Sequence, residues 1–207
     1  MPQPFKLSGR IHVGPGSLNN FPKIAARIGM IAAHEEQIQL YMTLVLAAML
    51  GHGRSAGLTM FNALSGSTQR RSVIDAIAVD VLDPQDHKAF EAITKKMTTS
   101  RKNRNSVVHG IWAVTDGHFD KLLRIDPSDQ ISHYVKTGVH PMRDGIRDGL
   151  KFWHWAEKDF IDVEKLCSEI SDELIAFMLK IDNKYQQTPD AALRQAASQV
   201  LHPKKHR

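Results

Sequence analysis

The stretch RKNRNSVVHG, Arg101–Gly110, decides the fold because the chain changes there from a helical pattern to a β pattern. Before it, apolar residues such as Phe90 and Ile93 recur at helical spacing. Gly110 is the residue type expected just past a helix end. After it the pattern alternates with a period of two, and Asp116-Gly117 is typical of a hairpin turn. The stretch therefore predicts a helix that ends where a β-hairpin begins.

The last turn of this predicted helix carries three polar side chains. Asn105 and His109 are four residues apart, so they lie on one helix face with Arg104 beside them. The helix dipole favours a protonated His109, which can donate a proton, and the Arg104 guanidinium suits a phosphate oxygen. Together they match phosphodiester chemistry. The alternative is that all three only cap the helix, because cations there satisfy its last carbonyl groups.

The pattern Arg104-Asn105-x-x-x-His109 resembles the Arg-Asn-x-x-x-His signature of HEPN-domain proteins, many of which are metal-independent ribonucleases. The resemblance extends to the order of the surrounding elements over residues 24–182, and it includes the step His109-Gly110-Ile111-Trp112. It implies a mainly α fold, a HEPN-like helical bundle with a small β-hairpin or sheet insertion after the motif helix.

The resemblance also implies a mechanism. RNA supplies its own nucleophile, the ribose 2′-hydroxyl, so an enzyme needs to move protons and to stabilise charge on the phosphorane. By family likeness His109 would do the first and Arg104 the second, while Asn105 would hold the imidazole or the phosphate. One histidine does not easily act as base and acid in one step. The family pairs two motifs across a two-fold interface, so a homodimer is expected. The resemblance implies no cofactor.

Other functions stay open. Toxins of one branch of the family carry a tyrosine two residues after the histidine, where this chain has Ile111, so we do not predict their antitoxin partnership. An antitoxin or another protein partner remains open, and a toxin or defence role is an expectation from the family alone. Many HEPN-like domains serve as scaffolds or sensors. The alternative to an endoribonuclease is therefore a non-catalytic RNA-binding or protein-interaction module.

Charged residues outside the motif add weaker candidates. Four basic residues are candidate contacts to RNA phosphates: Arg101, Lys102, Arg70 and Arg71. For Arg70 and Arg71 a solvated helix start is the alternative, and it is favoured for paired arginines outside a motif. Glu35 and Glu36 interrupt an apolar helix; exposure to solvent is favoured for both, and Glu36 as a partner of Arg104 is the other interpretation.

Composition predicts a folded protein, and the motifs that bind zinc or nucleotide phosphates are not expected to be part of it. Hydrophobic residues make up 42% of the 207 residues, and the net charge of +5 is compatible with RNA without requiring it. Cys167 is the single cysteine, which favours a reducing, cytoplasmic compartment. Zinc-ligand spacings and a Gly-Lys-Ser/Thr phosphate loop are absent from the sequence. The longest apolar run, Leu40 to Leu50, is too short to span a bilayer, and the N-terminus lacks the apolar core of a signal peptide, so a soluble protein is expected.

The organisation expected along the chain is one domain with two flanking segments. Residues 1–22 are predicted to be an irregular lead-in, with a short strand at 11–13 also compatible. Residues 23–182 are predicted to be a single HEPN-like helical domain with a β insertion near 111–156, and residues 183–207 a polar tail. Within the insertion, 131–139 and 150–156 could be strands, with a loop or weak helix at 141–149. Trp153 and Trp155 there suit base stacking or, as favoured, half-buried strand packing.

Overall fold

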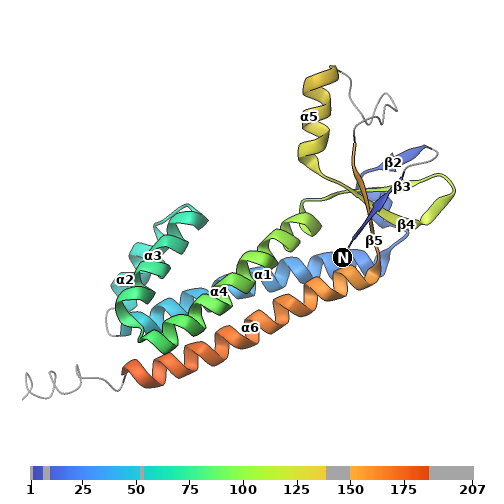
Figure 1. The fold of residues 1–207 in the computed structure, drawn as a ribbon. Helices are drawn as coiled ribbons and strands as arrows, with labels where there is room; N and C mark the ends of the chain where they lie inside the picture. The colour runs from blue at the N-terminus through green and yellow to red at the C-terminus, as the bar shows by residue number, and fades with distance from the viewer. Residues whose placement is uncertain (1, 7–9, 52–53, 139–149, 187–207) are drawn as a thin grey trace, which may run out of the picture. The chain divides into compact units, whose positions relative to one another are not determined.

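The computed structural model describes residues 2–6, 10–51, 54–138 and 150–186 (Figure 1). The described part is mostly helical and contains one five-stranded antiparallel sheet, so the mainly α expectation is confirmed. It falls into two compact units. The sheet unit combines the described residues of 1–37 and 95–170, and the helical unit those of 38–94 and 171–207. The prediction of one domain over 23–182 did not distinguish these units.

Six α-helices form in the described part, and local signals explain most of their ends. Their bounds are α1 Pro22–Leu50, α2 Arg54–Asn62, α3 Ser67–Val81, α4 Pro84–Val108, α5 Pro127–Thr137 and α6 Glu157–Gln186. Asp83 precedes α4 and accepts a hydrogen bond from the Asp86 amide at 2.8 Å, which satisfies one free donor of the first turn. Asp126 caps α5 in the same way through Ser128, and Gly138, with φ 67°, ends it.

The helical unit holds α2 and α3 together with segments of α1, α4 and α6. Its α4 and α6 segments meet through stacked Phe90 and Phe177, whose ring centroids are 5.8 Å apart. An ion cluster joins the same two segments, because buried Asp86 is paired with Lys180 and Lys184 of α6. These contacts fix the first half of the helix whose far end carries the motif.

The sheet takes strands from three parts of the chain. Its order is β1-β5-β4-β3-β2, with β1 Gln3–Phe5, β2 Ile11–Val13, β3 Ile111–Thr115, β4 His118–Ile125 and β5 Phe152–Trp155. The hairpin β3–β4 was predicted. The short strand named as compatible with residues 11–13 forms the edge strand β2. The irregular lead-in is corrected at residues 3–5, which form the other edge strand β1, so the sheet extends beyond the insertion expected near 111–156.

The stretch from 131 to 139 is also corrected, because residues 127–137 form α5 rather than a strand. The physical reason is the strong pair of end signals, an Asp-Pro start and a glycine stop. The expected strand at 150–156 is confirmed as β5. The expected loop at 141–149 lies outside the described residues, as does most of the polar tail, although α6 extends to Gln186.

The two faces of the sheet differ in what they carry. Ala113, Leu123 and Phe152 share one face and form an apolar cluster with Ile125. The opposite face carries Trp112, Arg124 and Trp155. Trp112 and Trp155 meet edge to face and both contact Phe160 of α6, so this second face is the one that packs on the helices of the sheet unit. Arg124 lies on this face, and its guanidinium contacts the last turn of α4.

Candidate functional site at the end of α4

The three motif side chains meet in the last turn of α4. Arg104 Nη1 donates a hydrogen bond to Asn105 Oδ1 at 3.1 Å and lies 3.2 Å from His109 Nε2. Helix α4 ends at Val108, but the His109 amide still donates to the Asn105 carbonyl at 3.1 Å. His109 is therefore held at the helix end by its own backbone, with its imidazole exposed beside the guanidinium.

The Arg104–His109 contact restricts the hydrogen-bonding roles that its two nitrogens can take. An arginine side chain carries only donors and keeps its proton in proteins, so a hydrogen bond from Nη1 requires a lone pair on His109 Nε2. The contact therefore fits the neutral tautomer that carries its proton on Nδ1. In the protonated form, which the helix dipole was expected to favour, two donors would face each other, so Arg104 would have to turn away from the ring.

The Arg104 guanidinium still has an unused donor. Its Nε–H is buried and makes no hydrogen bond within the described part of the protein. A buried donor without a partner costs about 1–3 kcal/mol, so a rearrangement that gave it an acceptor would be favourable. Arg104 thus combines a fixed positive charge with hydrogen-bonding capacity that this conformation does not use.

The chain was compared with protein-family models, with curated proteins and with solved structures. None of them matches. The functional assignment therefore rests on the residues at the end of α4 and on their surroundings in the sheet unit.

Arg124 was not among the residues singled out in the sequence, although it contacts the motif turn. Its Nε donates to the Ser106 carbonyl at 2.6 Å and its Nη2 to Asp126 Oδ2 at 3.1 Å. Hydrogen bonds to Asp126 from the Ser128 hydroxyl and amide, and from Arg124, hold the pKa of Asp126 below its usual value, and the hydroxyl contributes most. The signal in the sequence was a lone arginine inside the apolar strand run 122–125.

The neighbouring basic candidates on α4, Arg101 and Lys102, differ in exposure and in their acidic neighbours. Arg101 Nε lies 3.7 Å from Glu35 Oε1 of α1, and the Glu35 side chain is nearly buried. Glu36 is exposed, so the acidic residue that faces an arginine is Glu35, and that arginine is Arg101 rather than Arg104. Lys102 is exposed one residue further along. Lys102 is therefore better placed than Arg101 to reach a polyanion near the motif.

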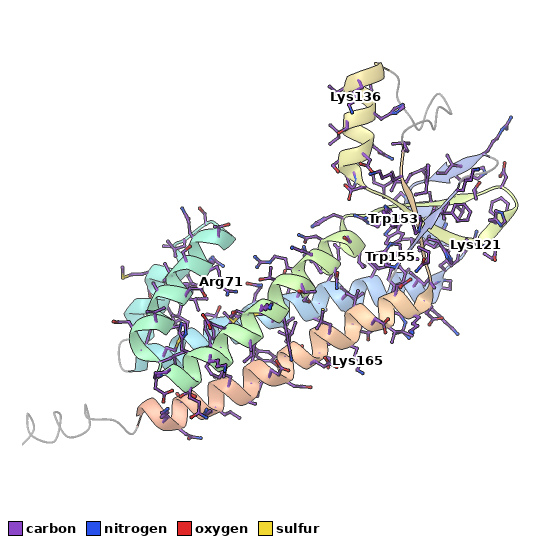
Figure 2. The ribbon with its side chains drawn as sticks, in the orientation of Figure 1. Arg71, Lys121, Lys136, Trp153, Trp155 and Lys165 are labelled. Atoms are coloured by element: carbon purple, nitrogen blue, oxygen red, sulfur yellow. The ribbon has the colours of Figure 1, made fainter. Side chains whose placement is uncertain are left out.

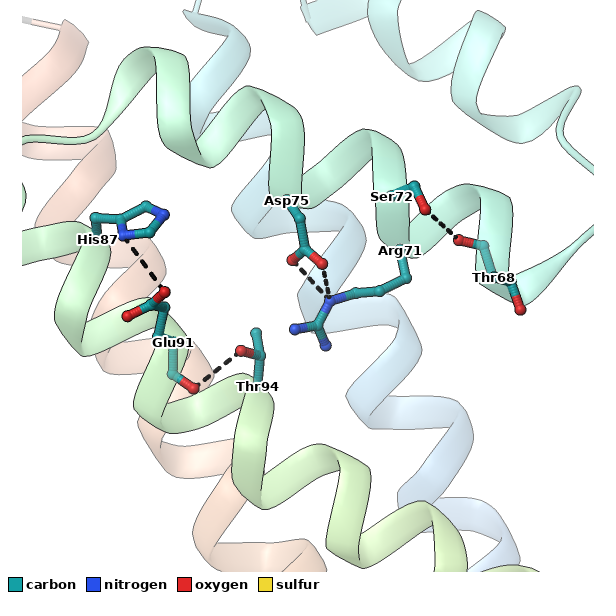
Figure 3. Close-up of polar contacts among 7 residues, drawn as sticks. All are labelled: Thr68, Arg71, Ser72, Asp75, His87, Glu91 and Thr94. Atoms are coloured by element: carbon teal, nitrogen blue, oxygen red, sulfur yellow. Dashed lines mark hydrogen bonds and ion pairs between the residues drawn. The ribbon is translucent and has the colours of Figure 1, made fainter.

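The remaining basic candidates belong to the helical unit. Arg70 Nε donates to the Leu64 carbonyl at 2.9 Å, and its guanidinium lies over the Phe61 ring. Arg71 pairs with Asp75 at 2.7 Å on the same helix, as Figure 3 shows. Both guanidinium groups are half-buried and have protein partners, an arrangement that neither the solvated helix start nor the phosphate contacts had anticipated. The motif and these two arginines lie in different units.

The aromatic segment on β5 mainly builds the core. Trp155 is buried and packs against Trp112 and Phe160, while Trp153 is half-buried beside it on the strand (Figure 2). This arrangement matches the favoured interpretation of strand packing. Among the described residues, no cluster of three or more His, Cys, Asp or Glu side chains could hold a metal ion, and no helix is both long and apolar enough to cross a membrane.

Proposed function

We propose that the protein is a metal-independent endoribonuclease that cleaves RNA by attack of a ribose 2′-hydroxyl on the adjacent phosphate. His109 takes the proton from the hydroxyl, and Arg104 stabilises the charge that develops on the phosphorane. The observation that carries the proposal is the contact of Arg104 Nη1 with both Asn105 Oδ1 and His109 Nε2.

That contact supports the assigned roles on chemical grounds. A neutral imidazole is a general base once Arg104 turns from Nε2 to the phosphate and frees that lone pair, and such catalysis contributes about 10²–10⁴ in rate. A planar guanidinium offers several donors to phosphate oxygens, and preorganised charge of this kind strongly stabilises a developing anion. If the guanidinium turned toward an incoming phosphate, Arg104 Nε–H, which is buried here, would also gain the partner that it lacks in this conformation.

The proposed reaction also needs a proton donor for the leaving 5′-oxygen. His109 as the base is not protonated at the start of that step, so a second group must act as the acid. A second copy of the chain would supply another Arg104 and another His109, which in its protonated form donates the proton to the leaving oxygen. We therefore place the active site at a homodimer interface, where two exposed motif turns face one phosphate.

Cleavage of a mixed RNA pool in EDTA tests the proposal. Purified wild-type protein should cleave, His109→Ala and Arg104→Ala should not, and the products should carry 2′,3′-cyclic phosphate or 3′-phosphate ends. Arg104→Lys should recover only part of the activity, because lysine keeps the charge but loses the planar fork.

A matched control is present on the same helix. His87 on α4 pairs with Glu91 at 3.8 Å in the helical unit, so His87→Ala removes an α4 histidine without touching the motif (Figure 3). It should cleave like the wild type. Equal loss in His87→Ala and His109→Ala would count against the assigned role of His109.

A non-catalytic interaction module is the second candidate, and α5 favours it. Ile131, Tyr134 and Val135 recur at helical spacing on α5, and their side chains are 66%, 53% and 76% exposed. An exposed apolar stripe of this kind is typical of a surface that binds another macromolecule. A folded protein without mutant-sensitive cleavage, whose α5 is needed to bind a partner, would support this function instead.

A further inference from the structure

Arg124 reaches the motif turn from the sheet. Its Nε–H donates to the carbonyl of Ser106, which lies between Asn105 and His109, at 2.6 Å. The last carbonyl groups of a helix have no partner within the helix, and a cation beside them is favourable. We infer that Arg124 is a positioning residue for His109, because it fixes the helix turn from which the imidazole projects. As far as it concerns catalysis, this inference rests on the proposed nuclease function.

The surroundings of Arg124 suit a fixed anchor. Its side chain is only 11% exposed, and Nη2 is paired with Asp126 at 3.1 Å. Trp112 and Trp153 are its cross-strand neighbours on β3 and β5. A nearly buried arginine is stable only when its donors have acceptors. Here Nη2 donates to Asp126, which caps α5, and Nε donates to the Ser106 carbonyl of the motif turn. The guanidinium therefore holds the helix end in one place relative to the sheet.

Gly110 permits this approach. A β-carbon at position 110 would lie 2.6 Å from the Ser106 carbonyl oxygen and 3.0 Å from Arg124 Nε. Gly110 is not among the glycines with positive φ, so the requirement here is space rather than backbone conformation. Gly110→Ala should therefore disturb the same hydrogen bond from the opposite side, by pushing Ser106 and Arg124 apart.

The consequence for His109 follows from its backbone. The His109 amide is bonded to the Asn105 carbonyl, and the chain leaves the helix at Gly110 to enter β3. Without the Arg124 bond, Ser106 loses its partner and the last turn can fray. The imidazole would then lose its fixed distance from Arg104. A misplacement of about 1 Å costs on the order of 100-fold in rate when reacting groups are otherwise aligned.

The test compares Arg124→Gln, Arg124→Lys, Gly110→Ala and the double variant Arg124→Gln/Gly110→Ala with a control on the same strand. Lys121→Gln serves as that control, because Lys121 lies over the Phe5 ring at 5.6 Å rather than on the motif turn. The first readout is the imidazole nitrogen NMR signal of His109, assigned by its loss in His109→Ala. The second is kcat and KM for RNA cleavage. Circular dichroism reports whether each variant is folded.

We expect folded Arg124→Gln and Gly110→Ala to change the tautomer signal of His109 and to lower kcat by about 10- to 100-fold with little change in KM. The double variant should be no worse than the more damaged single one, because both substitutions break one contact. Arg124→Lys should restore part of kcat, and Lys121→Gln should match the wild type. If Arg124→Gln does not fold, the His109 signal and kcat of Gly110→Ala decide whether the Arg124–Ser106 contact positions His109.

An unchanged His109 signal in the folded variants would overturn the inference. Such an unchanged signal would overturn the inference whether or not the variants still cleave RNA. Absence of cleavage by the wild-type protein would instead refute the proposed nuclease function, and the NMR readout would still decide whether Arg124 positions His109. The two failures are therefore distinguishable.

Discussion

Substitution of Asp86 by Asn should destabilise the helical unit in a pH-dependent way. Asp86 lies in the first turn of α4, its side chain is only 1% exposed, and it pairs with two lysines of α6. Lys180 Nζ is 2.5 Å from Oδ1, and Lys184 Nζ is 2.6 Å from Oδ2. Asn keeps the size of the side chain but removes the charge that both lysines face.

The magnitude follows from these two contacts. A hydrogen bond to a charged group contributes about 1.5–3 kcal/mol, but the lysine side chains are 51% and 42% exposed, so water screens both pairs. We expect Asp86→Asn to lower the free energy of unfolding at pH 7 by about 2 kcal/mol.

The sign of the pH dependence is fixed by the direction of the pKa shift. Burial alone would raise the pKa of Asp86, but the hydrogen bonds from Lys180 and Lys184 outweigh burial and hold it below the ordinary 3.8. A carboxyl group with a depressed folded pKa contributes stability that is present above its unfolded pKa and is lost as the pH falls through the folded pKa. The difference between wild type and Asp86→Asn should thus be full at pH 7 and should shrink below about pH 4.

Urea unfolding of both proteins, repeated from pH 7 to pH 3, measures this difference. Glu91→Gln is the control, because Glu91 lies on the same helix, is 66% exposed and faces His87 at 3.8 Å. It should change stability by less than about 0.5 kcal/mol at any of these pH values. A loss in Asp86→Asn that persisted undiminished at pH 3 would refute the electrostatic reasoning and assign the effect to packing.

Three further predictions concern other parts of the chain. Cys167 is buried, its pKa is raised by burial, and its Sγ lies 3.2 Å from the Ser100 hydroxyl, so Ellman's reagent should modify it only after denaturant unfolds the protein. Trp155→Ala should cost about 3–5 kcal/mol in urea unfolding, whereas Trp153→Ala should cost less because that indole is only half-buried. Arg71→Ala, which breaks one partly exposed ion pair, should change stability by less than about 1 kcal/mol and leave RNA cleavage at the wild-type rate.

The helices could be predicted because their ends carry local signals. Gly51 follows α1, Asp83 precedes α4 with Pro84 as its first residue, and Gly110 comes after its end. Each signal acts within a few residues of the helix end. The helix at 127–137 carried equally clear signals, namely Asp126-Pro127 and Gly138, but from the sequence the apolar residues after 131 were only considered as a possible strand. Its exposed Ile131, Tyr134 and Val135 recur at three and four, which is a helical period.

Local sequence signals of this kind could not predict the edge strand β1 or the contact of Arg124 with Ser106. Gln3–Phe5 is three residues long and contains a proline, so it has no alternation from which to predict a strand. It is a strand because it pairs with β5, about 150 residues later in the chain. Arg124 meets Ser106 only because the hairpin register places it on the face of the sheet toward α4. Pairing between distant segments is set by tertiary contacts, which single-sequence patterns do not contain.

The proposed 2′-hydroxyl attack is tested most directly by a single-atom change in the substrate. Once a cleavage site is mapped in RNA, an otherwise identical strand is made with 2′-deoxyribose at the nucleotide on the 5′ side of that bond, and both strands are incubated with the protein in EDTA. The account predicts that the all-ribose strand is cut to a 2′,3′-cyclic phosphate in a reaction that needs Arg104 and His109, and that the deoxy strand stays intact. Cleavage of the deoxy strand at the same bond would contradict it, because water rather than the ribose would then be the nucleophile.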